Sequence, residues 1–196
     1  AVSTPQSVGL QAGKWCSYAK PGDQPGEQGP DDADSVTFQT DPLEADLEIA
    51  GDAAFDMVFT SDRPVALIAA RLVDVAPGGA ATRISYGMLN LTHRDSHEHP
   101  APLEPGTAHR ARMSLKHVAQ TLRKGHCLRL ALSNTYFPMA WPAPEAAELV
   151  LDLAHCALIL PERRGADGEL RDFGPPVAAP ALEVEVQAPA NFDWRV

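Results

Sequence analysis

Serine chemistry is the first possibility that the residue types of this 196-residue chain raise. A serine nucleophile of the α/β-hydrolase kind sits in the pattern G-x-S-x-G, because the glycines permit a tight, strained turn. The run RISYG, residues 83–87, has the trailing Gly87 but carries Arg83 in place of the leading glycine. Ser85 also lies inside an alternating strand pattern. We therefore predict that Ser85 is no nucleophile and that the chain has no catalytic residue.

Histidines in the run HRDSHEH, residues 93–99, raise the possibility of a metal site. On a helix, His93 and His97 would share one face, as a zinc site requires. However, the run precedes the sequence PAPLEPG and is typical of a loop, so a solvated loop is the favoured interpretation. A metal-dependent sandwich enzyme that uses His93, His97 and His99 stays as an alternative hypothesis.

Two His-Cys pairs, His126-Cys127 and His155-Cys156, resemble halves of a split zinc site. Neighbouring residues on a strand point to opposite faces, so neither pair can chelate one ion. Buried, unreactive cysteines are favoured, and we expect no metal and no cofactor. Three cysteines, with Cys16 as the third, are too few for a disulfide framework and favour a reducing, cytoplasmic location.

Charge is unevenly distributed along the chain. Residues 1–62 hold 12 Asp/Glu against two lysines, which accounts for the net charge of −10, while residues 63–135 hold ten Lys/Arg against four Asp/Glu. This asymmetry predicts that the acidic segment folds back over the basic middle or reaches a basic face of a partner. No basic patch with interleaved aromatics favours nucleic acid, and no apolar stretch approaches the roughly 20 residues of a membrane helix.

The elements that would position these side chains are strands. Apolar residues alternate with polar ones in several runs, a period that places one face on a core and the other toward water. These runs lie at 55–59, 84–91, 110–115, 128–132 and 149–153. About eight short antiparallel strands with long connections indicate an all-β sandwich, with a jelly roll as the leading candidate.

Two local exceptions interrupt the strand pattern. Leu115, Val118, Ala119 and Leu122, ended by Gly125, have helical spacing and predict a short turn of helix. Within the run at 84–91, the apolar set shifts phase at Gly87, which suggests a bulge.

Composition divides the chain into three regions. Residues 1–34 are rich in Pro, Gly and Asp and predict a linker or docking arm. Residues 35–161 hold the strand patterns, and residues 162–196 form a Pro/Ala-rich extension with one strand-like run, LEVEVQ. The chain lacks both a signal-peptide pattern and a methionine before Met57, so we expect it to be a piece of a longer protein.

Several runs together resemble one known module. DPLEADLEIAG (41–51), RLVDVAPGG (71–79) and GHCLRLALSNTYFP (125–138) are similar to the signature runs of the C-terminal domain in the cocaine esterase and X-Pro dipeptidyl-peptidase family of serine hydrolases. YGMLNLTHRDSHEHPAPLEPG (86–106) resembles the segment that joins the second run to the third. The resemblance covers roughly residues 35–161.

The resemblance implies a jelly-roll sandwich of the galactose-binding-domain-like kind. In this family the Ser-His-Asp triad lies in a preceding α/β-hydrolase domain, and the jelly roll is a non-catalytic part that shapes the substrate cleft and stabilises the assembly. The implied partner is therefore the α/β-hydrolase catalytic domain of the same polypeptide. No triad position falls on this chain. Whether the parent cleaves esters, amides or X-Pro peptides is left open, as is homo-oligomerisation.

The run from Gly125 to Trp141 is then a turn, a core strand and a bend. Arg129, opposite the leucine face, is a candidate for an interdomain contact. Tyr136, Phe137 and Trp141 lie where end loops of a jelly roll would face a partner or ligand, or would simply close the sandwich. A free-standing carbohydrate-binding module is the alternative function, because end-loop aromatics can stack on sugars.

Overall fold

The computed structural model describes residues 1–18, 22–165, 174, 175 and 177. Residues Ala1–Arg164 form one compact unit, which is the part described below. The predicted strand-like run LEVEVQ lies outside the described residues. None of the described helices is long and apolar enough to span a membrane.

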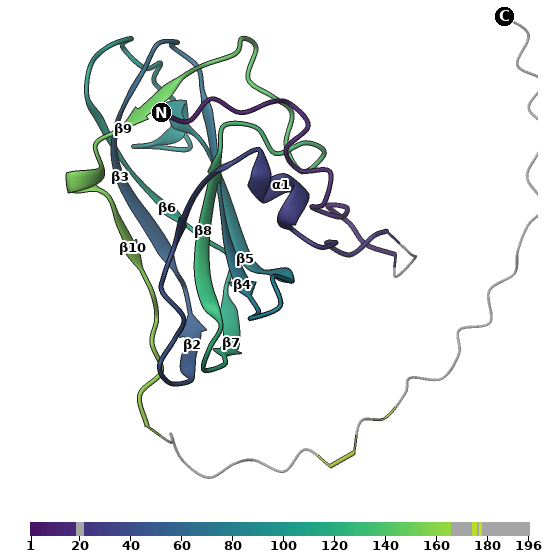
Figure 1. The fold of residues 1–196 in the computed structure, drawn as a ribbon. Helices are drawn as coiled ribbons and strands as arrows, with labels where there is room; N and C mark the ends of the chain where they lie inside the picture. Colours follow the sequence, from purple (N-terminus) through teal and green to yellow (C-terminus); the bar gives the residue numbers. More distant parts are fainter. Residues whose placement is uncertain (19–21, 166–173, 176, 178–196) are drawn as a thin grey trace, which may run out of the picture. The chain divides into compact units, whose positions relative to one another are not determined.

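Ten strands and three short helical segments make up the described secondary structure (Figure 1). The strands are β1 (Val36–Gln39), β2 (Leu47–Gly51), β3 (Ala54–Ser61), β4 (Leu67–Val75), β5 (Ala81–Asn90), β6 (His109–Ser114), β7 (Val118–Leu122), β8 (Cys127–Ser133), β9 (Leu149–Leu151) and β10 (Ala157–Ile159). The helical segments are α1 (Gly29–Ala33), η1 (Leu91–His93) and η2 (Leu153–His155).

These strands form antiparallel sheets. Sheet 1 has the order β1-β8-β4-β5, and sheet 2 has the order β10-β3-β6 with β9 also paired to β3. Strands β2 and β7 form a separate two-stranded ribbon. The prediction of an all-β fold with antiparallel sheets is confirmed.

Alternation along β3 and β8 builds the core between sheets 1 and 2. Phe55, Met57 and Phe59 of β3 are buried, and Leu130 and Leu132 are their counterparts on β8. Each such side chain contributes about 1.5–3 kcal/mol when it leaves water completely. The alternating runs therefore locate this core correctly.

Strand β4, like its neighbour β8, is buried on both faces. Ile68, Ala70 and Leu72 join the core between the sheets, while Ala69 packs in a second cluster on the other side of sheet 1. A strand covered on both faces has a near-continuous apolar sequence instead of a clean alternation. Arg71 interrupts that sequence and is completely buried.

The second cover of sheet 1 is the N-terminal arm, defined here as the described part of residues 1–34. Its first residues pair with sheet 2, because Val2 exchanges backbone hydrogen bonds with Leu149 at 2.6 and 3.0 Å. Further along, Val8 and Ala12 pack with Ala69 of β4 on the outer face of sheet 1. Figure 1 shows α1, the end of the arm, beside sheet 1. The arm is therefore a third layer that touches both sheets.

The prediction of a helical turn at 115–122 is wrong. Val118–Leu122 forms strand β7, which pairs with β2 in register from Leu47↔Leu122 to Gly51↔Val118. Buried positions four residues apart, such as Val118 and Leu122, suit either a helix turn or one face of a strand. Pairing with a distant strand decides between the two.

The bulge lies near Gly87 but not at it. Strand β5 shifts register against β4 between Leu72 and Val73, which face Ser85 and Arg83, so Ile84 is the extra residue. Gly87 has another reason for being glycine. A Cβ there would lie 2.6 Å from the carbonyl oxygen of Ser114, so the backbones approach too closely for a side chain.

Candidate functional site

The residues with possible serine or metal chemistry, Ser85 and the histidines of residues 93–99, do not come together as a reactive site in the described part of the chain. Ser85 is buried, and its hydroxyl donates to the backbone carbonyl of Lys116. The rings of His93 and His97 lie 5.5 Å apart, yet no three His, Cys, Asp or Glu side chains gather as a metal site in the described part of the chain. The three cysteines are free thiols.

His126 pairs with a carboxylate of the neighbouring strand. Its Nδ1 lies 2.7 Å from Oδ1 of Asp74 on β4. The next residue, Cys127, is buried in a small cluster with Val73 and Val75. The pair at 126–127 thus points to opposite faces, as the strand pattern predicts.

Arg129 is used inside the domain. Its Nη1 donates to Oδ2 of Asp32 at 2.7 Å, and its Nε and Nη2 donate to Oε1 of Gln39 at 2.9 and 2.7 Å. The side chain is 21% exposed. Arg129 therefore holds the arm on sheet 1 and has little of its guanidinium left for a partner.

A buried arginine lies next to it in the same ionic cluster. Arg71 donates to Ser35 Oγ at 2.7 Å and to the carbonyl oxygen of Asp31 at 3.1 Å, and its Nη2 lies 3.1 Å from Oδ1 of Asp32. Burial raises the pKa of Asp32, outweighing the hydrogen bond from Arg129 and the positive charge of Arg71, both of which lower it. The expected fold-back of the acidic segment over the basic middle is confirmed here.

Tyr136 is buried completely under the arm. Its hydroxyl accepts a hydrogen bond from Arg83, and its ring lies 6.0 Å from that of Tyr86. Burial raises the pKa of the phenol, against the lowering effect of the Arg83 charge. Tyr136 thus anchors the bend after β8 from within and does not reach the surface.

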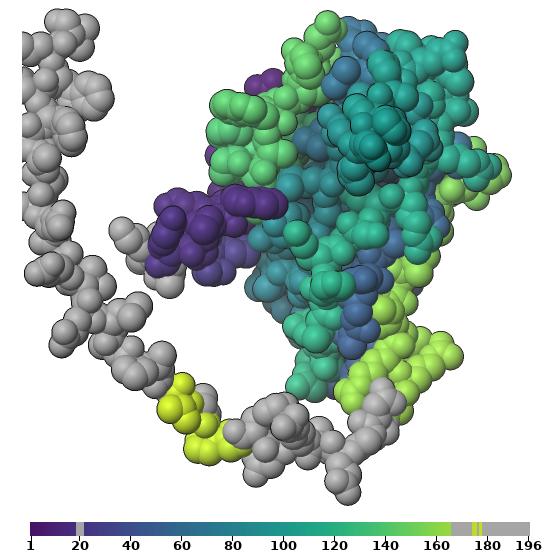
Figure 2. Space-filling model, turned by 180° about the vertical axis from the view of Figure 1, so that it is seen from behind, coloured from purple at the N-terminus to yellow at the C-terminus, as the bar shows by residue number. Residues whose placement is uncertain are grey.

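Phe137 and Trp141 form an exposed aromatic pair, which we name the aromatic surface. Their rings stack 5.5 Å apart at 15°, with Phe137 36% and Trp141 82% exposed. The backbone N–H of Phe137 donates to the Val8 carbonyl at 3.2 Å, so the arm supports the pair. Figure 2 shows the purple arm lying against the green segment that contains it. A cavity of about 480 Å³ lies beside Trp141, with Leu67, Met88 and Pro142 in its lining.

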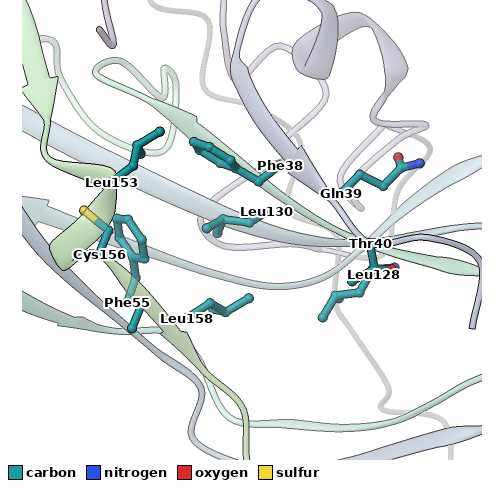
Figure 3. A pocket seen from close by; sticks show the side chains of 10 residues that line it. Phe38, Gln39, Thr40, Phe55, Leu128, Leu130, Leu153, Cys156 and Leu158 are labelled. Carbon is teal, nitrogen blue, oxygen red and sulfur yellow. The ribbon is translucent and has the colours of Figure 1, made fainter.

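The sequence did not predict a second surface, which we name the edge groove. It is an opening of about 460 Å³ between β1 of sheet 1 and β10 of sheet 2 (Figure 3). The residues that line it are Phe38, Gln39, Thr40, Phe55, Leu128, Leu130, Leu153, Cys156, Ala157 and Leu158. No motif in the sequence marks these residues as one site, and only the three-dimensional arrangement brings them together along this edge.

Comparison with protein families identifies the family of this domain. The model of the X-Pro dipeptidyl-peptidase C-terminal non-catalytic domain matches residues 2–167. The chain belongs to that family. The match begins inside the arm, in keeping with an arm that packs on the sandwich as part of the same compact unit. Membership in a non-catalytic family agrees with the sequence resemblance described above.

Individual relatives agree with the family. Cocaine esterase from Rhodococcus sp. (strain MB1 Bresler) is 24% identical over 116 residues, which is 58% of this chain and 20% of the esterase. An α-amino acid ester hydrolase structure matches 70% of this chain and 27% of its own, with 21% identity and a TM-score of 0.66. A CocE/NonD family hydrolase from Staphylococcus aureus matches 69% and 31%, with 14% identity and a TM-score of 0.58. This chain thus spans a fifth to a third of each relative.

Proposed function

We propose that this domain is the accessory C-terminal part of a longer serine hydrolase, an acyl esterase or X-Pro dipeptidyl-peptidase-like enzyme. In this proposal it packs against the α/β-hydrolase catalytic domain of the same polypeptide, shapes the substrate cleft and stabilises the assembly. The carrying observation is the non-catalytic family match over residues 2–167, together with hydrolase relatives of which the matched part makes up only a fifth to a third. Residues 35–161 are the sandwich in this proposal, and residues 1–34 are an arm that docks on this sandwich.

The aromatic surface is the proposed contact with the catalytic domain. Aromatic anchors with large exposed area dominate the energy of protein interfaces, and Trp141 is 82% exposed. The other two predicted residues act indirectly, since Tyr136 fixes the bend from within and Arg129 fixes the arm that supports Phe137. An interface between domains of one chain buries on the order of 600–1,500 Å² and is more polar than a core.

The carbohydrate-binding alternative gains nothing from these contacts. The rings of Phe137 and Trp141 stack on each other, so one face of each is already occupied. The relatives named above are hydrolases. A cytoplasmic location remains part of the proposal and is supported by three unpaired cysteines. Homo-oligomerisation is also part of it, and the molar mass of the chain in solution tests that point.

Binding to the separately expressed catalytic domain tests the proposal. We expect the 196-residue chain to bind it, and a double Phe137→Ala, Trp141→Ala variant to bind at least about tenfold more weakly, which corresponds to 1.4 kcal/mol. Trp15→Ala is the matched control, because Trp15 is also an exposed tryptophan, 67% exposed on the arm. Titration calorimetry at low and high salt supplies the affinities.

Two results would contradict the proposal. One is no binding at either salt concentration. The other is an affinity that the folded double variant retains in full, or that Trp15→Ala lowers as much as the double variant does.

A further inference from the structure

The edge groove has the chemistry of a binding site. Eight of its ten lining residues are apolar, the other two are Gln39 and Thr40, and no charged side chain is among them. Its volume of about 460 Å³ is within the range of about 300–1,000 Å³ that ligand pockets occupy. Phe38 and Leu153 lie on its rim, 38% and 58% exposed. The volume and the apolar lining together suit an occupant that brings apolar groups of its own.

Both walls of the groove are strand edges. Strand β1 pairs only with β8, and β10 pairs only with β3, within the part of the chain that the structure describes. Each therefore presents a row of backbone N–H and C=O groups on its outer side. A peptide that adds as a further strand satisfies such a row, and its alternate side chains fill the adjacent apolar space. A small apolar molecule would leave the row unpaired.

A second copy of this chain fits the groove poorly. Its own edge strands β1 and β10 direct Phe38 and Leu158 into their own groove, as Figure 3 shows, so these side chains cannot also fill the groove of a neighbour. The occupant must bring apolar side chains of its own. Since this chain spans only a fifth to a third of its relatives, most of the parental polypeptide lies outside it.

We infer that the edge groove holds an extended segment of the parental polypeptide outside these residues. The segment carries apolar side chains at alternate positions and pairs with the free edge of β1 or β10. This inference rests on the proposed function, because it takes the parent to be a longer hydrolase. It adds a second contact, which is separate from the aromatic surface and made by strand addition instead of aromatic anchoring.

Cys156 provides a reporter inside the groove. Its thiol lines the opening (Figure 3) and is partly buried. In the full-length parental protein, we expect alkylation of Cys156 by iodoacetamide to be at least about tenfold slower than in the 196-residue chain, because the occupant must first leave. Mass spectrometry of the separate peptides measures each cysteine, and the exposed Cys16 calibrates the reagent.

A pair of variants makes this test specific. Leu153→Asp places a charge on the groove rim, and we expect it to restore fast alkylation of Cys156 in the parental protein. Val150→Asp is the control, since Val150 is 47% exposed on nearby β9 but does not line the groove. A photo-crosslinking benzoylphenylalanine in place of Phe38 should then form a crosslink to one segment of the same polypeptide outside residues 1–196.

The outcomes separate this inference from the proposed function. Oxidative footprinting of Trp141 reports on the aromatic surface independently. Protection of Trp141 without protection of Cys156 would keep the proposed interface and overturn the groove inference. Protection of Cys156 with an unprotected Trp141 would support the groove and count against the aromatic interface. Crosslinks between two copies, or equal Cys156 rates in the parental protein and the isolated chain, would also overturn the groove inference.

Discussion

Replacing Arg71 by methionine should destabilise the domain more than any other single change to an ion pair. Arg71 is completely buried on β4 and donates to Gln28, Asp31 and Ser35 of the arm and the turn after it. Methionine keeps much of the stem volume, so little cavity forms. What remains is the buried carboxylate of Asp32, which loses the cation 3.1 Å away and keeps that of the partly exposed Arg129.

The expected loss follows from burial. Removing one partner of a buried ion pair costs about 3–5 kcal/mol, because the other charge stays in a low-dielectric site. The matched comparison is Arg129→Met. Arg129 contacts the same Asp32 at a shorter distance, 2.7 Å, but is 21% exposed, so water can replace part of what is lost. We expect about 1–2 kcal/mol for Arg129→Met, typical of one hydrogen bond to a charged group.

Urea unfolding followed by far-UV circular dichroism measures both variants. With a slope near 2 kcal/mol per molar urea, Arg71→Met should lower the midpoint by about 2 M and Arg129→Met by less than about 1 M. If Arg129→Met lowered the free energy of unfolding as much as Arg71→Met does, burial would not be what decides the size of the loss. A loss below about 1 kcal/mol for Arg71→Met would refute the reasoning altogether.

Two further predictions concern single residues. Burial raises the pKa of Asp32 above its ordinary value of 3.8. The folded state therefore holds the proton of Asp32 more tightly than the unfolded state does. The stability that this proton contributes is complete below pH 3.8 and is lost as the pH rises through the raised pKa. The stability advantage of wild type over Asp32→Asn should thus shrink as the pH rises from about 4 in urea titrations, and an advantage that grows would contradict this. Gly87→Ala, whose Cβ would meet the Ser114 carbonyl, should lose about 1–3 kcal/mol in thermal unfolding, while Gly78→Ala, in open space, should lose far less.

Period-2 alternation predicts the central strands because burial on one face leaves a local mark. Strand β3 follows this rule, with Phe55, Met57 and Phe59 on the core side. Strand β8 also places its leucines on the core side, although its other face, with Ala131 and Ser133, is buried as well. Strand β7 does not follow the rule, since its pattern over five residues suits a helix equally well. Its partner β2 lies about 70 positions earlier in the chain, where no local pattern can show the pairing.

The candidate site was predictable in part. The sequence points to the aromatics 136–141, but it cannot show that Tyr136 is buried while Trp141 is exposed, since that depends on where the arm lies. One signal was available for the arm. An arginine inside the apolar run of β4, residues 67–75, needs an anionic partner, and the acidic excess in 1–62 could supply it. No comparable feature of the sequence indicated the edge groove.

The arm also imposes an order on biosynthesis. Among the described residues it is the first part that the ribosome makes, yet its partners come much later: Thr4 binds Asn134, which is 130 positions further along. At about 5–20 residues per second, the arm waits on the order of ten seconds before that partner emerges. Until then Val2 and Val8 lack their later partners, whereas the polar partners of Arg71, residues 28–35, are made before Arg71 itself. The first residues to be synthesised therefore wait longest for the residues that they pack against.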